Sequence, residues 1–240
     1  MTMIRASGAV LAALAAATAW RVATAPSDAL QGVIQKILYV HVPCAFAAYA
    51  GFLVCGAAGT LYLWRQDERY DWLALSAAEV GVVFCTLNIA SGPIWARGTW
   101  GHWWAWDPRL TVTLLLWFVY LAYLLLRSFT EGNERTARFA AVYGLLGCLA
   151  IPLNYYAIEV FGGAAMHPEN LERDSLGAGM GLPFALAVLT GLAGFWHLLL
   201  VRADLEALRR MAGAPERGEN ARVEGAGQAL AVDKTRPPGV

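Results

Sequence analysis

Five of the ten tryptophans in this chain fall within the stretch WARGTWGHWWAWDPRLT at positions 95–111. An indole ring combines a broad apolar face with a single N–H group at its edge. So dense a set of rings suits a flat, mostly apolar ligand better than it suits a sugar or an ion. The four rings that we assign to a ligand platform are Trp100, Trp103, Trp104 and Trp106.

Tryptophan also serves as an anchor at the membrane–water interface, where its ring lies at headgroup depth. That role accounts for Trp20, Trp64 and Trp72, which stand near the ends of apolar runs, and it stays open for Trp95. It accounts poorly for the four platform rings, because they are too close together in the sequence for simple anchoring.

Side chains that could bind a metal or a carboxylate accompany the platform. Neutral imidazoles are natural axial donors to a metal, and a guanidinium group binds a carboxylate through two N–H groups. The candidates are His41, His102, His167, Arg97 and Arg109. Haem, a planar macrocycle with an iron and two propionates, would use all three kinds of side chain. The alternative for each histidine is a hydrogen bond to a nearby carbonyl, and we interpret the fourth, His197, as structural.

The composition indicates that these residues belong to a membrane protein. The chain is 58% hydrophobic and 15% charged, with a mean hydropathy of +0.47, whereas about a quarter of the residues in a soluble domain are charged. A net charge of zero argues against a nucleic-acid partner. The four cysteines lie singly in apolar runs, which supports neither a disulfide framework nor a redox motif.

We expect an all-α bundle of six transmembrane helices with an outward-facing tryptophan-rich loop at about 95–109. A spanning helix needs roughly 20 mostly apolar residues. The six stretches that meet this need are Ser7–Ala23, Leu38–Trp64, Trp72–Ile94, Leu110–Leu126, Ala137–Ile158 and Ala178–Val201. Residues 1–202 thus form the membrane domain. Residues 203–240 form a cytoplasmic tail, largely disordered because it is poor in residues that could form a core.

The distribution of Lys and Arg predicts the orientation, because these residues favour the cytoplasmic side. The face that holds both termini receives Arg5, Arg65, Arg69, Arg127, Arg135, Arg138, Arg202, Arg209 and Arg210. The opposite face receives Arg21, Lys36, Arg97, Arg109 and Arg173. Both termini are therefore expected in the cytoplasm, and the tryptophan loop faces outward.

Two features of the spans leave alternatives open. The segment up to Ala25 resembles a cleavable secretory signal, but Pro26 would follow the cut, so we favour a retained first helix. Glu79 lies inside the third span, where an ionised carboxylate is costly. It could be protonated, paired with a polar group such as Asn154, or in contact with a partner.

The tryptophan stretch resembles the signature of the WWD family of haem-handling membrane proteins in cytochrome c biogenesis. Within that family the Arg-Leu-Thr ending after Asp107-Pro108 is similar to the haem exporter protein C (CcmC) branch, whereas haem lyase branches tend to continue with Glu. Further segments agree with the resemblance, which covers roughly residues 30–205: KILYVHVPCA, SAAEVGVVF, SGPIW and YYAIEVF…MHP.

The resemblance implies a function in the bacterial inner membrane. A member of this family holds haem b at the periplasmic face and passes it to a periplasmic haem chaperone (CcmE-like) during c-type cytochrome maturation. His41 and His167 would be the axial ligands of the haem iron, with Asp107 part of the platform and His102 the alternative ligand. Further implied partners are a small single-span helper (CcmD-like) and an ATP-binding-cassette complex (CcmA/CcmB-like).

The expected activity is haem binding and transfer rather than catalysis. The chain has no phosphate-binding loop of the G-x-x-x-x-G-K-[ST] type, so any use of ATP falls to another subunit. The main alternative is a haem lyase that attaches haem to apocytochrome c, which would be expected to have more spans or a large periplasmic domain. A solute permease would be expected to have internal repeats, and we find no convincing repeat.

Overall fold

The computed structural model describes residues 2–129, 133–162, 167 and 176–234. In this part of the chain the regular structure is entirely helical apart from one isolated β-bridge. The elements are α1 (Thr2–Thr24), the 3-10 helix η1 (Val33–Ile37), α2 (Leu38–Arg65), α3 (Glu68–Trp100), α4 (Pro108–Ser128), α5 (Glu134–Tyr155), α6 (Ala157–Phe161) and α7 (Gly181–Lys234). Six helices in the described residues are long and apolar enough to cross a membrane, which confirms the predicted six-span bundle.

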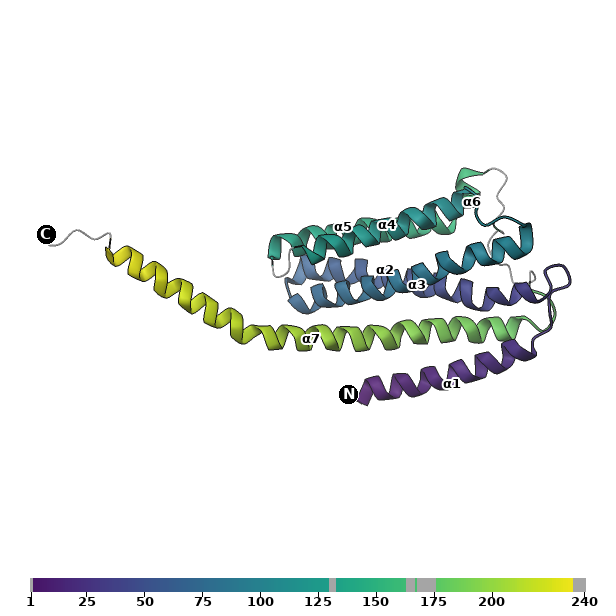
Figure 1. Ribbon diagram of the computed structural model, residues 1–240, viewed down its shortest axis with the longest axis horizontal. Helices are drawn as coiled ribbons and strands as arrows, with labels where there is room; N and C mark the ends of the chain where they lie inside the picture. The colour runs from purple at the N-terminus through teal and green to yellow at the C-terminus, as the bar shows by residue number, and fades with distance from the viewer. Residues whose placement is uncertain (1, 130–132, 163–166, 168–175, 235–240) are drawn as a thin grey trace. The chain divides into compact units, whose positions relative to one another are not determined.

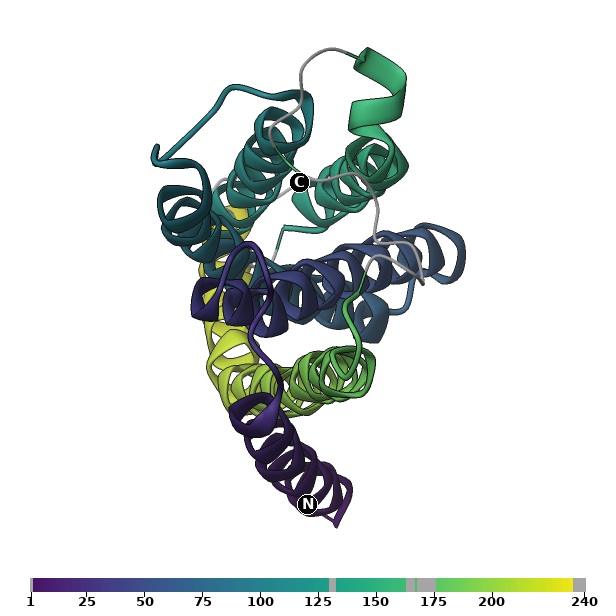
Figure 2. The same cartoon turned by 90° about the vertical axis from the view of Figure 1, so that its right-hand side faces the viewer.

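The chain divides into two compact units, Met1–Arg202 and Ala203–Val240. In the first unit α2 and α3 lie in the centre, α4 and α5 cover one side of them, and α1 and the first part of α7 cover the other (Figures 1 and 2). The second unit continues α7 as helix up to Lys234, in the segment for which the composition predicts disorder. The disorder of this tail stays a prediction, and Arg173, one of the charges used for the orientation, lies outside the described residues.

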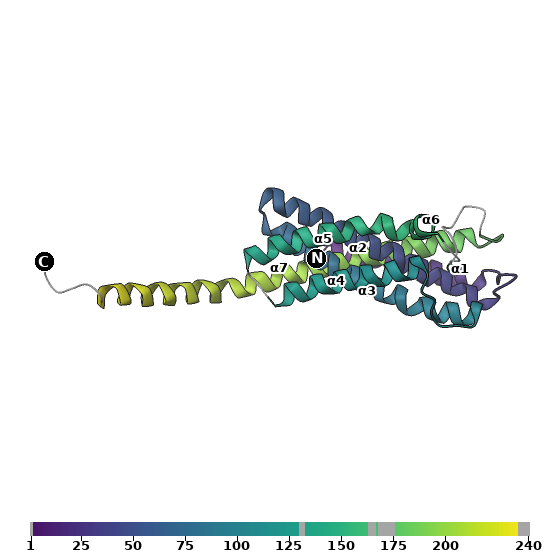
Figure 3. The same cartoon turned by 90° about the horizontal axis from the view of Figure 1, so that it is seen from above.

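Helix ends along the chain follow local capping rules. Gln66 ends α2 in the left-handed conformation, at φ 55°, and the Asp67 carboxylate caps α3 by accepting from Arg69 N at 2.9 Å. Asn133 caps α5 in the same way, through Arg135 N. The links from α2 to α3 (66–67) and from α3 to α4 (101–107) are short, so each of these helices runs antiparallel to the next; Figure 3 shows the bundle from above.

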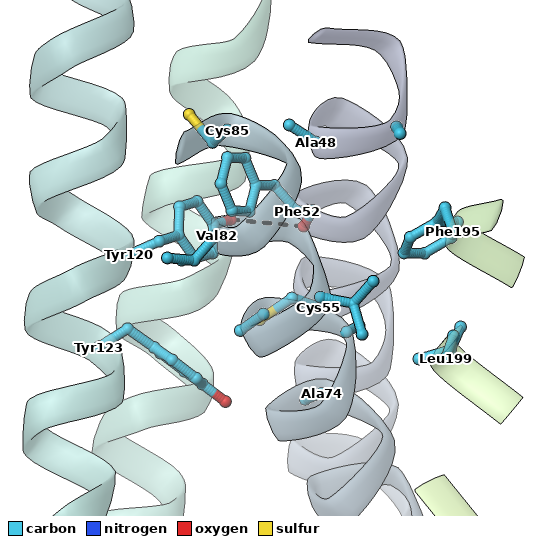
Figure 4. Packing of buried hydrophobic residues seen from close by; sticks show 14 of the residues in the cluster. Ala48, Phe52, Cys55, Ala74, Val82, Cys85, Tyr120, Tyr123, Phe195 and Leu199 are labelled. Carbon is cyan, nitrogen blue, oxygen red and sulfur yellow. Dashed lines mark hydrogen bonds between the residues drawn. The ribbon is translucent and has the colours of Figure 1, made fainter. Parts of the chain in front are cut away.

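The core of the first unit depends on small residues where helices meet. A Cβ atom added at Gly51 would lie 2.7 Å from Gly81 Cα, so α2 and α3 approach each other backbone to backbone. Nearby, the Phe52 ring stacks on Tyr120 of α4 at 3.7 Å between centroids and 7° between planes (Figure 4). The Tyr120 hydroxyl lies within hydrogen-bond distance of a carbonyl of α2 and a carbonyl of α5, so its one proton has an acceptor in the fully buried interior.

Ion pairs of α3 with α4 and with α7 join helices inside the first unit. Asp71 of α3 and Arg127 of α4 are both largely buried and lie 2.7 Å apart. Glu79 pairs with Arg202 of α7, and Arg202 Nη2 donates to Glu79 Oε1 at 2.9 Å. The alternative pairing of Glu79 with Asn154 is therefore wrong. Asn154 is fully buried elsewhere and bonds to Tyr49 and Thr113.

Candidate haem-binding site

The tryptophan-rich stretch is shorter as a loop than the sequence predicts. Residues 95–100 belong to the last turns of α3, which ends at Gly101 in the left-handed conformation, at φ 82°. Residues 108 and 109 already belong to α4, with Pro108 in its first turn. Only 101–107 is irregular. The expected loop at 95–109 is wrong in its boundaries because α3 continues to Trp100 and α4 already begins at Pro108.

Asp107 caps the helix that follows the loop and also holds the segment of the second candidate histidine. Its Oδ1 accepts from Leu110 N at 2.9 Å, and its Oδ2 accepts from the backbone N–H of His167 at 3.0 Å. The carboxylate is buried, with 5% of the residue exposed. One side chain of the Trp-Asp motif therefore connects the tryptophan loop to the bend that carries His167.

His41 and His167 lie beside each other although 126 positions separate them in the sequence. Their ring centroids are 6.3 Å apart, and the ring planes are tilted by 39°. His41 lies in the first turn of α2 and is largely buried, whereas His167 lies in the segment between α6 and α7. Of the three candidate histidines, His41 and His167 are the two whose rings lie next to each other. His102 instead contacts Trp100, at 6.4 Å between centroids.

The four platform tryptophans differ in exposure. Trp103 and Trp106 have 60% and 75% of their surface exposed, and Trp100 has 37%. Trp104 is half-buried and packs edge-to-face against Trp106 at 5.7 Å. These rings thus offer accessible apolar surface at the end of the bundle where α3 ends and α4 begins.

The two candidate arginines occupy different surroundings. Arg97 is exposed, donates to the carbonyl of Gly101 and lies 6.0 Å from the Trp103 ring centroid. Arg109 is mostly buried, donates to the Tyr155 carbonyl at 2.8 Å and lies 4.0 Å from Glu159. Arg109 therefore joins α4 to the end of α5 and to α6.

Several residues beside His41 were not identified from the sequence. Asn88 and Ser91 of α3 contact it, Gly92 leaves room for its ring, and Trp95 packs edge-on at 5.7 Å between centroids. Trp95 in turn donates to Gln31 at 2.8 Å, so its indole N–H is bonded within the protein. An asparagine in an apolar span and a Gly-Pro step in a helix are the signals that could have indicated these positions.

A free metal ion would need several ligands from the protein. Among the described residues no group of three or more His, Cys, Asp or Glu side chains is arranged to hold a metal ion. Two imidazoles at the separation of His41 and His167 would fit an iron whose other ligands come from a macrocycle. The fold and the site together define a multi-pass helical membrane protein that pairs two imidazoles beside an aromatic surface at one end of its bundle.

Comparison with known proteins gives the family. The family model described as heme exporter protein C matches residues 1–217. Heme exporter protein C of Paracoccus denitrificans is 33% identical over 229 residues, which cover 90% of this chain and 94% of the relative. That of Haemophilus influenzae is 30% identical over 200 residues, 82% of this chain and 80% of the relative. The chain therefore belongs to the heme exporter protein C family.

Proposed function

We propose that the protein binds haem b through His41 and His167 and delivers it to a periplasmic haem chaperone during c-type cytochrome maturation. The distance between the two rings carries this proposal. With metal–nitrogen bonds of about 2 Å, two imidazoles that share one metal from opposite sides have centroids about 6 Å apart. The 6.3 Å between His41 and His167 fits that arrangement.

The surroundings of the two rings also suit haem as cargo. Trp100, Trp103 and Trp106 expose apolar surface on which the macrocycle could lie. Arg97 is exposed beside this surface, so it is the arginine that we assign to a propionate. Arg109 already bonds to the α5 terminus and Glu159, so we assign it to positioning the start of α4.

The name shared by the relatives supports the choice of cargo, because those proteins are described as exporting haem. For this chain we propose the same cargo, with the site at the periplasmic face of a bacterial inner membrane. We propose an ATP-binding-cassette complex and a small single-span helper as further partners. Binding and transfer require no catalytic residue in the chain.

The positions of the two ligands suggest which one yields during transfer. His41 belongs to a long helix and is seated against α3, whereas His167 lies outside the helices and is tied to Asp107 through its backbone. We therefore propose that docking of the chaperone acts on the His167 side, while His41 retains its position.

A transfer assay tests this proposal. The full-length protein in detergent is loaded with haem, mixed with a tagged haem-free chaperone, and separated from it before the haem absorbance of each fraction is measured. We expect haem to move to the chaperone from the wild type and from His197→Ala, a control whose histidine contacts Ser7 of α1 instead of the site. Failure of the wild type to bind haem would overturn the whole proposal. Binding without movement to the chaperone would overturn delivery.

A further inference from the structure

The His41 side chain rests on one short segment of α3. His41 Nδ1 lies 3.0 Å from the Ser91 hydroxyl oxygen, and Trp95 packs against the edge of the ring. Asn88 donates to the His41 carbonyl at 3.0 Å. The segment Asn88–Trp95 therefore fixes both the backbone and the ring of the residue that we assign to the iron.

The Ser91 hydroxyl has one proton, and its neighbours decide where that proton points. Its oxygen lies 2.8 Å from the Leu87 carbonyl and 3.1 Å from the Asn88 carbonyl. A serine hydroxyl in a helix commonly donates to the carbonyl three or four residues earlier, and both of these carbonyls are within reach. With its proton donated to either carbonyl, the Ser91 oxygen is an acceptor for the ring, and His41 Nδ1 donates to it.

The Asn88 amide does not occupy the other ring nitrogen. Its Nδ2 lies 3.3 Å from His41 Nε2 and 3.4 Å from Nδ1. An atom at nearly equal distances from both nitrogens lies beside the ring and in line with neither lone pair. The Nε2 lone pair therefore stays directed away from Asn88 and can bind a metal.

Gly92 leaves room for the His41 ring in this position. A Cβ atom there would lie 3.2 Å from His41 Cε1 and 3.8 Å from Nδ1, closer to the ring carbon than most Cβ contacts allow. A side chain at position 92 would thus require the imidazole to shift by a few tenths of an ångström. Ser91 and Gly92 therefore act on the same His41 ring. Ser91 acts through a hydrogen bond, and Gly92 acts through the absence of a side chain.

We propose that Ser91 is a positioning residue that holds His41 as the Nδ1–H tautomer and presents Nε2 to the haem iron. The inference rests on the proposed haem-binding function. Ligand histidines commonly donate their second ring N–H to an acceptor, which fixes the tautomer and makes the ligand more basic. Ser91 supplies this acceptor from a neighbouring helix.

The test compares Ser91→Ala with Ser91→Thr in the full-length protein in detergent. Haem is titrated into each variant, and the reduction potential of the bound haem is then measured. We expect Ser91→Ala to weaken haem binding about 10–100-fold, as is typical of such outer partners of a metal ligand. Its potential should move to a more positive value because the less basic imidazole stabilises ferric iron less. Ser91→Thr keeps the hydroxyl and should behave as the wild type.

A matched control comes from the same helix. Thr86 donates to the Val82 carbonyl at 2.8 Å and accepts from Trp117 Nε1 at 2.9 Å, the same bonding pattern about 7.5 Å along α3. Thr86→Val should leave both readouts unchanged. If Ser91→Ala also leaves them unchanged while His41→Ala loses haem, the positioning role is overturned and the proposed function stands. If His41→Ala itself binds haem with an unaltered spectrum, both are overturned.

Discussion

At the scale of single residues, Asp107 is the connection on which the candidate site depends. Its two carboxylate oxygens have separate partners, Leu110 N in the first turn of α4 and the backbone N–H of His167. A buried carboxylate that accepts two backbone N–H groups is difficult to replace, because each N–H would lose a charged acceptor. The aspartate of the motif therefore positions the backbone of His167, which we propose as the second haem ligand.

Replacing Asp107 with alanine should weaken both structure and haem binding. Loss of the cap should lower the free energy of unfolding by about 0.5–2 kcal/mol. Haem affinity should fall to that of His167→Ala, because His167 loses its anchor. Thermal unfolding and haem titration in detergent measure the two effects. Asp67→Ala is the control, since Asp67 caps α3 through Arg69 N and lies in the link between α2 and α3. Haem affinity unchanged in Asp107→Ala would contradict the assigned role.

The side chains that carry the site were predictable to different degrees. His41, His167 and the platform tryptophans could be proposed as site residues because their residue types are rare in such surroundings and match a known motif. The partners of His41 could not, because a serine or a glycine in an apolar helix is common and has many ordinary explanations. The meeting of His41 with His167 is a long-range contact that depends on the packing of α2 against its neighbours.

At the scale of elements, α3 is longer than a membrane crossing requires. Its 33 residues correspond to about 50 Å, whereas a bilayer core is about 30 Å thick. The extra turns carry Trp95, Arg97 and Trp100 on the same rigid helix that seats His41. The sequence predicted a loop there because glycine and tryptophan interrupt the apolar pattern, but α3 continues to Trp100 and is capped only at Gly101.

The contact between α2 and α3 predicts a clear difference between two glycines. Gly51→Ala should destabilise the protein by about 1–3 kcal/mol, because its Cβ would lie 2.9 Å or less from backbone atoms of α3. Gly194→Ala is the control, since its nearest neighbour would be Phe84 at 3.6 Å, an ordinary contact. It should be neutral or stabilise the helix by up to about 1 kcal/mol. Equal melting temperatures for the two variants would contradict the close approach.

At the scale of the whole molecule, the bundle of the first unit combines a tight centre with a loosely attached α1. No residue of α1 is buried. Its polar contacts to α7 include Ser7 with His197 at 2.9 Å and Thr18 with Thr190 at 2.7 Å. The number and order of the spans were predictable from hydropathy alone. Which helices form the centre was not, because burial among spans depends on small-residue contacts that leave hydropathy unchanged.

The orientation of the bundle can be tested with single introduced cysteines. The native cysteines lie within the spans, and Cys44, Cys55 and Cys85 are buried. Leu30 and Phe129 lie at opposite ends of the bundle, with 97% and 82% of their surface exposed. In intact spheroplasts an impermeant maleimide should label Leu30→Cys at once and Phe129→Cys only after the membrane is permeabilised. The reverse pattern would place the haem site in the cytoplasm.

The measurement that tests the central claim most directly is the electron paramagnetic resonance spectrum of the haem-loaded protein, recorded for the wild type, His41→Ala and His167→Ala. The wild type should give a low-spin ferric signal with two imidazole ligands, because the two rings already stand at the separation that one shared iron requires. Each single variant should lose this signal and give a high-spin or differently ligated iron. A low-spin bis-imidazole signal that survives in either variant would contradict the pairing of His41 with His167.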